Sequence, residues 1–182
     1  MLDTFAHTDF PATGLASRLP GPVTVVIPTR NCAGTIAATV AELGLLAESG
    51  VIEQILVVDA DSPDGTAVTA RDAGAEVVSE NALAPEFGTV LGKGDAMWRS
   101  LKAVRGEIVV FVDGDIADFG RHYVTGLLGP LCNDGHQGPG TVRRFVKGTY
   151  RRPFRQDGTE HPHGGGRVTE LAARPLLARL VP

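Results

Sequence analysis

Residues 107–116 read Glu-Ile-Val-Val-Phe-Val-Asp-Gly-Asp-Ile. The run Ile108–Val112 is β-branched or aromatic throughout, which is typical of a strand buried on both faces of a sheet. The run ends in Asp113-Gly114-Asp115, two carboxylates separated by one glycine. Parallel α/β sheets bind ligands at the carboxyl ends of their strands, and paired carboxylates there suit a hydrated divalent cation that carries a diphosphate. The alternative is a plain acidic turn, because Asp and Gly are common turn formers.

The composition is that of one globular domain. The chain has 182 residues, of which 43% are apolar and 21% charged, and its net charge of −4 gives no global basic field for nucleic acid. No apolar run approaches the roughly 18 residues of a membrane span. The first residues lack the basic and apolar regions of a secretory signal. Cys32 and Cys132 stand far apart without metal or redox spacing, so we expect reduced thiols and a cytoplasmic protein.

The first 80 residues alternate between strand and helix patterns. Short β-branched runs predict strands at 23–27, 55–58 and 75–78, and apolar positions at helical spacing predict helices at 35–49 and 66–73. This alternation favours a parallel sheet with right-handed crossovers, as in nucleotide-binding domains. Residues 1–20 show little periodicity and are interpreted as an arm or irregular lead-in.

The second half of the chain is less regular. We predict a loop over 80–94, a helix over 96–104 with Asp95 as its N-cap, and then the buried strand over 108–112. A helix over 121–131 and a polar loop over 133–140 follow. The remaining segments are a predicted strand at 141–150, a basic mobile loop at 151–166 and a last helix at 168–180.

Several charged groups are candidates for chemistry. Asp59 and Asp113 end strands that would open at the same sheet edge, and Lys93 lies between two glycines, where backbone and a point charge could both approach a phosphate. The glycine-led helix start around Arg167 favours an anion, since free N–H groups and the macrodipole meet there. Each feature also has a plainer interpretation, as a solvated lysine or a flexible glycine linker.

Six motifs, in this order, resemble those of a known family. They are Val-Val-Ile-Pro-Thr-Arg-Asn, Val-Val-Asp-Ala-Asp-Ser-Pro-Asp-Gly-Thr, Gly-Lys-Gly-Asp-Ala-Met-Trp-Arg-Ser, Val-Phe-Val-Asp-Gly-Asp, Tyr-Arg-Arg-Pro-Phe and Gly-Gly-Gly-Arg-Val-Thr-Glu-Leu. From about residue 22 onward the chain resembles the glucosyl-3-phosphoglycerate synthases, retaining GT-A glycosyltransferases related to the mannosyl-3-phosphoglycerate synthases. The third and sixth motifs are the most specific.

The resemblance implies an α/β fold of the GT-A, Rossmann-like type, a mostly parallel sheet with helices on both faces, truncated at the C-terminus relative to the family. It implies a nucleotide-sugar-binding domain at 22–182, which includes the start of the acceptor-binding region, after an N-terminal arm at 1–21. The implied reaction moves glucose or mannose, with retention, from a UDP- or GDP-hexose to the 2-hydroxyl of 3-phosphoglycerate, using Mg²⁺ or Mn²⁺. A homodimer is expected, with neither nucleic acid nor membrane as a partner.

The resemblance also assigns roles to individual residues. The implied catalytic residues are Asp115, which would bind the metal, and Lys93. The implied nucleotide-sugar contacts are Pro28, Thr29, Arg30, Ser62, Lys93, Asp113, Gly114 and Asp115. The implied acceptor contacts are Gly166, Arg167, Val168 and Thr169.

Three departures from the family pattern leave alternatives open. Cys32 and Ala33 stand where the family has an acidic pair, and Gly114 stands where it often has serine. The resemblance places a histidine that completes the family's metal site beyond the last residue of this chain, so either the chain is a fragment, or this ligand is absent or supplied otherwise, with His161 or His163 as a hypothetical substitute. The alternatives are therefore a non-catalytic or weakly active nucleotide-sugar-binding fragment, or a GT-A transferase with another acceptor. A nucleotidyltransferase is disfavoured, because the loop after the first strand is not glycine-rich.

Overall fold

The computed structural model describes residues 4–132, 145–148, 154–156 and 159–161. The chain divides into two compact units, residues 1–146 and residues 147–182. Within the second unit the described residues form a short antiparallel pair, β5 (Phe154–Gln156) and β6 (Thr159–His161). The site described below belongs to the first unit.

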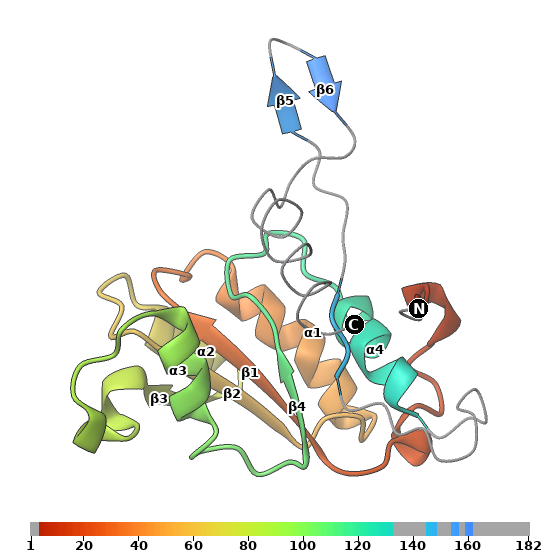
Figure 1. Cartoon of the computed structure of the whole chain (residues 1–182), viewed down its shortest axis with the longest axis horizontal. Coiled ribbons are helices and arrows are strands. Elements are labelled where there is room, and N and C mark those ends of the chain that lie inside the picture. The colour runs from red at the N-terminus through yellow and green to blue at the C-terminus, as the bar shows by residue number, and fades with distance from the viewer. Residues whose placement is uncertain (1–3, 133–144, 149–153, 157–158, 162–182) are drawn as a thin grey trace, which may run out of the picture. The chain divides into compact units, whose positions relative to one another are not determined.

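The first unit is built on a four-stranded parallel sheet (Figure 1), as predicted. The strand order is β3-β2-β1-β4, and the strands are β1 (Val23–Thr29), β2 (Gln54–Asp59), β3 (Glu76–Ser79) and β4 (Ile108–Phe111). The chain order reverses between β1 and β4, and in α/β sheets such a switch point is where ligands bind.

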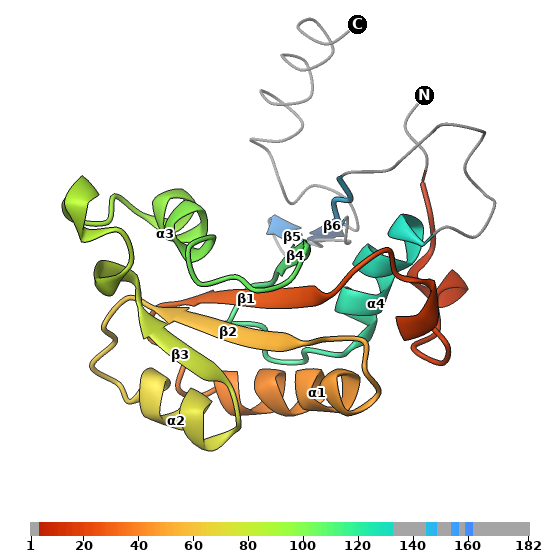
Figure 2. The ribbon, with the colours of Figure 1, turned by 90° about the horizontal axis from the view of Figure 1, so that it is seen from below.

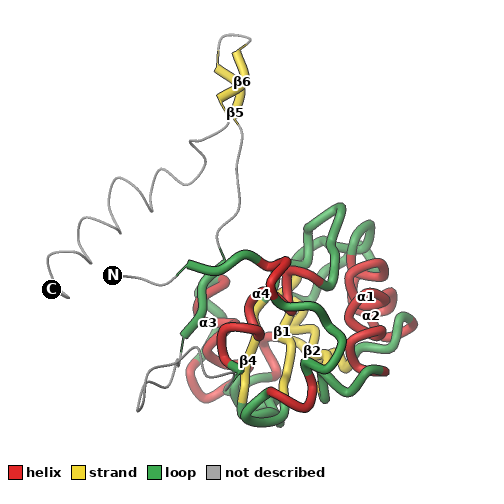
Figure 3. The backbone as a smooth tube through the Cα atoms, turned by 90° about the vertical axis from the view of Figure 1, so that its right-hand side faces the viewer, coloured by secondary structure: helices red, strands yellow, loops and turns green. Residues whose placement is uncertain are grey.

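Helices cover both faces of this sheet. Figure 2 shows α1 (Ile36–Glu48) and α2 (Thr66–Asp72) on one face and α3 (Lys93–Ser100) on the other, and Figure 3 shows α1 and α2 side by side. The larger core cluster joins α1 to the buried residues Val124 and Leu128 of α4 (His122–Leu128). The smaller cluster consists of Val26, Leu56 and Val58, and Ala103 and Val104, which follow α3, pack against it. Alternate side chains of β1 thus enter different layers, as period-2 strand geometry requires.

The segment before β1 packs on the core. It carries two short 3₁₀ helices, η1 (His7–Asp9) and η2 (Ala16–Arg18), and Leu15 between them is fully buried in the larger cluster. A Cβ added at Gly129 would lie 1.9 Å from the Phe10 ring, so this glycine lets the segment lie directly against the turn after α4. Within the described residues, no helix is both long enough and apolar enough to span a bilayer.

A buried polar network fixes the amino ends of the strands. The Gln54 side chain accepts hydrogen bonds from the Thr24 hydroxyl and the Arg105 amide, each at 2.9 Å, and donates to the Ala103 carbonyl and to Glu76, each at 3.0 Å. Because every polar atom of the buried amide has a partner, the network anchors the chain between α3 and β4 without an unsatisfied group.

The structure corrects four local predictions. Helix α3 begins at Lys93 and ends at Ser100, so the loop is shorter than predicted and Asp95 lies in the first turn, with Gly92 as the N-cap. Strand β4 is only partly buried, because it lies at the edge of the described sheet. Residues 145–148 form no regular structure where a strand was predicted, and the predicted loop at 151–166 contains β5 and β6. The predicted last helix lies outside the described residues.

Gly106 offers a test of the close contact between the chain entering β4 and strand β1. A Cβ at this position would lie 2.7 Å from the Pro22 carbonyl oxygen and 2.7 Å from the Thr24 nitrogen, both backbone atoms that cannot move aside. We expect Gly106→Ala to lower the free energy of unfolding by about 1–3 kcal/mol. The matched control is Gly44→Ala in the interior of α1, where a Cβ meets no atom within 4 Å, and which should stabilise by about 0.5–1 kcal/mol. Urea unfolding of both variants measures the difference, and equal effects would contradict this account.

Candidate functional site

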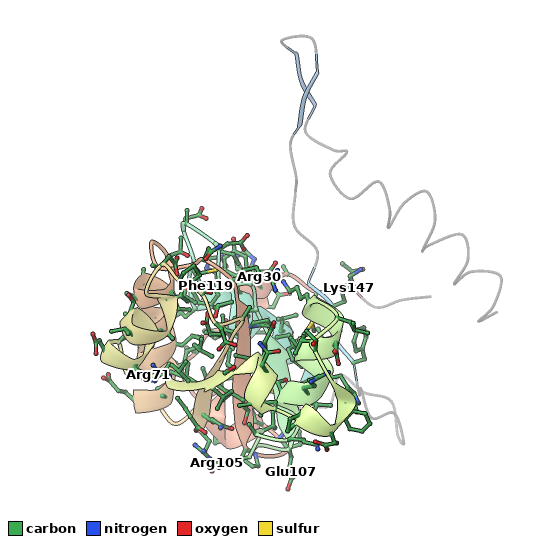
Figure 4. All side chains as sticks on the ribbon, turned by 90° about the vertical axis from the view of Figure 1, so that its left-hand side faces the viewer. Arg30, Arg71, Arg105, Glu107, Phe119 and Lys147 are labelled. Atoms are coloured by element: carbon green, nitrogen blue, oxygen red, sulfur yellow. The ribbon has the colours of Figure 1, made fainter. Side chains whose placement is uncertain are left out.

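The carboxyl ends of β1, β2 and β4 bring together all the predicted nucleotide-sugar residues. Thr29 and Asp59 are register partners at the ends of β1 and β2, Ser62 follows β2, and the turn Asp113-Gly114-Asp115 follows β4. Figure 4 shows Arg30 at this end of the sheet, with Arg105 and Glu107 at the opposite end.

The first two loops are tied together by the buried carboxylate of Asp59, which is 3% exposed. Asp59 accepts the Thr29 hydroxyl at 2.9 Å, the Ser62 hydroxyl at 2.8 Å and the Ser62 amide at 2.8 Å. The Ser62 oxygen in turn accepts the Asn31 amide at 2.9 Å. Because its proton is committed to Asp59, the Ser62 hydroxyl can only accept a hydrogen bond from a ligand.

A second tie joins the same loops one turn further on. The Thr66 hydroxyl accepts the Cys32 amide at 2.8 Å and donates to Asp64 at 2.6 Å, while Asp64 also accepts the Ala33 amide at 3.0 Å. These hydrogen bonds, that from Thr66 above all, lower the pKa of the Asp64 carboxyl. Cys32 and Ala33, where the resemblance leads one to expect an acidic pair, are thus held through their backbone amides, which every residue type except proline supplies.

Backbone strain marks both loops. Asn31 and Asp61 adopt left-handed conformations, with φ of 56° and 54°. Asn and Asp tolerate this region better than other non-glycine residues. The Asn81 side chain donates to Asp61 at 2.8 Å, and this hydrogen bond lowers the pKa of the Asp61 carboxyl. The conformation of each loop is therefore supported both by its residue type and by a specific hydrogen-bond partner.

The acidic turn lies directly against the end of β1. The Val26 carbonyl accepts the Val112 amide at 3.1 Å, but Pro28, two residues further along the same edge, has no N–H to offer, and the β1–β4 pairing ends. A Cβ at Gly114 would lie 2.7 Å from the Thr29 methyl carbon, and the Gly114 carbonyl accepts the Thr35 hydroxyl at 2.6 Å. Glycine between the two aspartates therefore lets the turn approach β1.

Two basic side chains reach the site. Lys93, the first residue of α3, forms an ion pair with Asp113, and both side chains remain about half exposed. Arg30 lies 3.7 Å from Glu80, with 71% of its side chain exposed. Burial raises the pKa of Glu80, an effect that the Arg30 charge opposes in part. Neither cation is neutralised in a buried pair, so both can turn to an anionic ligand.

The acidic turn suits a cation that arrives with its substrate. Among the described residues, no group of three or more His, Cys, Asp or Glu side chains could hold a metal ion. Mg²⁺, however, is commonly held by one or two carboxylates together with substrate phosphates and water. Asp115 is exposed and Asp113 is half exposed beside Lys93. These residues fit a metal–diphosphate complex.

Some predictions lie beyond what the structure tests. The acceptor residues Gly166, Arg167, Val168 and Thr169, and His163, are outside the described residues. Two hollows in the described part lie elsewhere; one of about 410 Å³ is lined by residues such as Pro22 and Glu53 at the amino ends of the strands. The sequence analysis missed the roles of Thr35, Asp64 and Arg99. Of these three, only Arg99 could have been found from the sequence, because it stands at i, i+4 spacing from Asp95, a spacing at which ion pairs form on helices.

Comparison with known proteins agrees with this geometry. Glucosyl-3-phosphoglycerate synthase from Mycolicibacterium smegmatis is 43% identical over 169 residues, which are 92% of this chain and 53% of the relative. The crystal structure of mannosyl-3-phosphoglycerate synthase from Rubrobacter xylanophilus matches with a TM-score of 0.81 and 44% identity, over 98% of this chain and 55% of that one.

A third match carries ligands. Glucosyl-3-phosphoglycerate synthase from Mycobacterium tuberculosis, in complex with Mn²⁺, UDP and glucosyl-3-phosphoglycerate, matches with a TM-score of 0.76 and 36% identity, over 97% of this chain and 57% of that one. The chain thus spans about half the length of the relatives it matches. The fold is that of the GT-A synthases.

The profile of the family described as Glycosyl transferase family 2 matches residues 24–175, which include the parallel sheet except its first residue, Val23, and the acidic turn Asp113-Gly114-Asp115. The chain belongs to glycosyl transferase family 2.

Proposed function

We propose that this chain is a retaining, metal-dependent hexosyltransferase that moves glucose or mannose from a UDP- or GDP-sugar to the 2-hydroxyl of 3-phosphoglycerate. The observation that carries the proposal is the pairing of Lys93 with Asp113 beside Gly114 and Asp115, at the switch point of a parallel sheet. The names and bound ligands of the similar synthases support the substrates.

In this proposal the loops after β1 and β2 bind the nucleoside. Pro28, Thr29 and Arg30 line one side and Ser62 the other, with Asp59 holding Thr29 and Ser62 at fixed positions. The Ser62 oxygen, limited to accepting, suits an N–H of a base or a ribose hydroxyl. Arg30, with its exposed guanidinium, adds a charged donor that can follow the ligand.

Lys93 and the acidic turn handle the diphosphate. Asp115, with Asp113 beside it, would hold Mg²⁺ or Mn²⁺, which when bound neutralises charge on the leaving diphosphate. Lys93 would turn from Asp113 to the phosphate oxygens and stabilise the negative charge that builds as the glycosidic bond breaks. Gly166, Arg167, Val168 and Thr169 would be the acceptor contacts, and transfer with retention would require the acceptor hydroxyl to reach the anomeric carbon from the side that the diphosphate leaves.

Two narrower predictions belong to the same proposal. The first is a cytoplasmic location, which nucleotide-sugar and phosphoglycerate substrates fit. The second is a homodimer, for which the mass in solution by light scattering is the direct measurement.

One alternative has its own observation. The chain spans about half of its relatives, and the described residues hold no three-ligand metal group. The alternative is a chain that binds the nucleotide sugar without turnover. Calorimetric binding of UDP-glucose or GDP-mannose with no product in the presence of 3-phosphoglycerate would favour this alternative.

The direct test of the proposal is a product assay. The chain is incubated with 3-phosphoglycerate and either UDP-glucose or GDP-mannose, and the phosphorylated glycoside is followed by mass spectrometry. We expect product with Mg²⁺ or Mn²⁺ and at least about a 100-fold lower rate after chelation with EDTA, because the diphosphate then leaves without charge neutralisation. Binding of neither donor, with or without metal, would refute the proposal.

Asp115 provides a test of the metal assignment. We expect Asp115→Asn to lower metal-dependent transfer, or metal-dependent UDP binding if turnover is absent, by at least about 100-fold, because the amide cannot replace a charged ligand. Asp118→Asn is the matched control: it removes the same charge from an exposed carboxyl three positions along and should leave both unchanged. An Asp115→Asn variant as active as the parent would rule out the assignment.

Lys93 is tested by comparing two ligands. Lys93→Met should weaken UDP binding by about 10- to 100-fold, the loss of one charge-assisted contact, and should leave uridine binding unchanged, because uridine carries no phosphate. Lys102→Met, which removes an exposed lysine paired with Glu86, should change neither affinity. Titration calorimetry gives all four values, and an equal loss for uridine would show that Lys93 does not act on the diphosphate.

A further inference from the structure

Arg99 on α3 is the largest fully buried side chain among the described residues, with 1% exposure. A buried guanidinium is costly unless every donor finds a partner. Two of its nitrogens face the Asp95 carboxylate, with Nε to Oδ1 at 3.0 Å and Nη2 to Oδ2 at 3.1 Å. This fork-on-carboxylate geometry fixes direction as well as distance. These contacts lower the pKa of the Asp95 carboxyl, so the pair is charged near neutral pH.

The other donors of Arg99 hold the connection that precedes α3. Its Nη1 donates to the carbonyl of Gly88 at 2.8 Å and to those of Leu83 and Ala84, each at 3.3 Å. Ala84 is left-handed, with φ of 53°, a conformation that costs about 1–3 kcal/mol and persists only where its surroundings impose it. The backbone from Leu83 to Gly88 is therefore held by hydrogen bonds to the buried guanidinium of Arg99.

Asp95 also holds the backbone close to Lys93 by a hydrogen bond. Its Oδ2 accepts the Leu91 amide at 2.9 Å, although the Leu91 side chain itself is 91% exposed and has little packing to hold it. Leu91 lies two residues before Lys93, and Asp95 two residues after it. The backbone is thus fixed on both sides of a lysine whose long side chain, 57% exposed, is not fixed by packing.

We propose that Arg99 and Asp95 are positioning residues that fix the backbone at the start of α3. They thereby hold Lys93 at a distance from Asp113 from which its amino group can contact the oxygens of a diphosphate. The proposal rests on the proposed function of Lys93. Arg99 and Asp95 act through Lys93 and touch no ligand themselves. A purely structural pair would change stability without changing how the folded chain distinguishes a nucleoside diphosphate from its nucleoside.

The test uses Asp95→Asn, because Asp95 is partly exposed and its amide analogue keeps the side-chain shape. Affinities for UDP and for uridine are measured by calorimetry on the full chain, beside thermal unfolding. We expect UDP binding about 10-fold weaker with uridine binding unchanged. Arg105→Gln is the control, since it breaks an arginine–carboxylate pair at the far end of the sheet, and it should leave the UDP-to-uridine ratio as it was.

A double-mutant cycle then asks whether the effect passes through Lys93. In the Lys93→Met background, Asp95→Asn should change UDP affinity by less than about twofold, because no amino group remains to be placed. The same 10-fold loss in that background, or an unchanged ratio in the single variant, would overturn the proposal. A parent chain that binds uridine but gains nothing from the diphosphate would instead refute the role proposed for Lys93, and the inference with it.

Amide hydrogen exchange gives a measurement that needs no ligand. Asp95→Asn should speed exchange of the Leu91 amide and of residues 88–92 by about 10-fold or more, while amides of β1 and β2 keep the parent rates. Unchanged exchange over 88–92 would show that Asp95 does not hold this segment, and would overturn the proposal independently of nucleotide binding.

Discussion

The buried carboxylate of Asp59 is the constraint on which the site depends. A charge removed from water needs full hydrogen bonding, and Asp59 obtains it from Thr29 and from two groups of Ser62. Those donors come from the end of β1 and from the loop after β2. The hydrogen bonds that stabilise the buried carboxylate therefore also hold these two segments in alignment. A register shift of one residue between β1 and β2 would strip Asp59 of the Thr29 hydroxyl.

The acidic turn is joined to this framework by packing rather than by charge. Gly114 lies against Thr29, and its carbonyl receives the Thr35 hydroxyl from the start of α1. Asp113 and Asp115 therefore project from a backbone that is fixed, while their carboxylates stay accessible. A turn with a rigid backbone and solvent-exposed carboxylates suits a ligand that binds together with a cation, because the carboxylates need not lose their water before binding.

The sequence predicted the elements whose signal is local. Strands β1 and β2 and helix α1 have strong periodicity, and the loops that follow the strands contain the residues that the motifs singled out. It did not predict the burial of β4, since a run such as Ile108–Val112 fits a central strand and an edge strand equally well. The predicted start of α3 was wrong because Gly92 and Gly94 suggested a loop, whereas in the structure Arg99 and Asp95 hydrogen-bond to the backbone that precedes the helix. That effect is tertiary and leaves no trace in propensity.

The Gln54 network lies at the amino ends of the strands, whereas the candidate nucleotide-sugar groups among the described residues lie at the carboxyl ends. Cohesion of the sheet and recognition of ligands are therefore assigned to separate ends of the same strands. Exposed positions such as Arg30 can then be exchanged with little effect on the folding equilibrium. A scaffold arranged in this way is suited to diversification of donor preference, because selection or engineering can vary the ligand-facing end while the opposite end preserves solubility and expression.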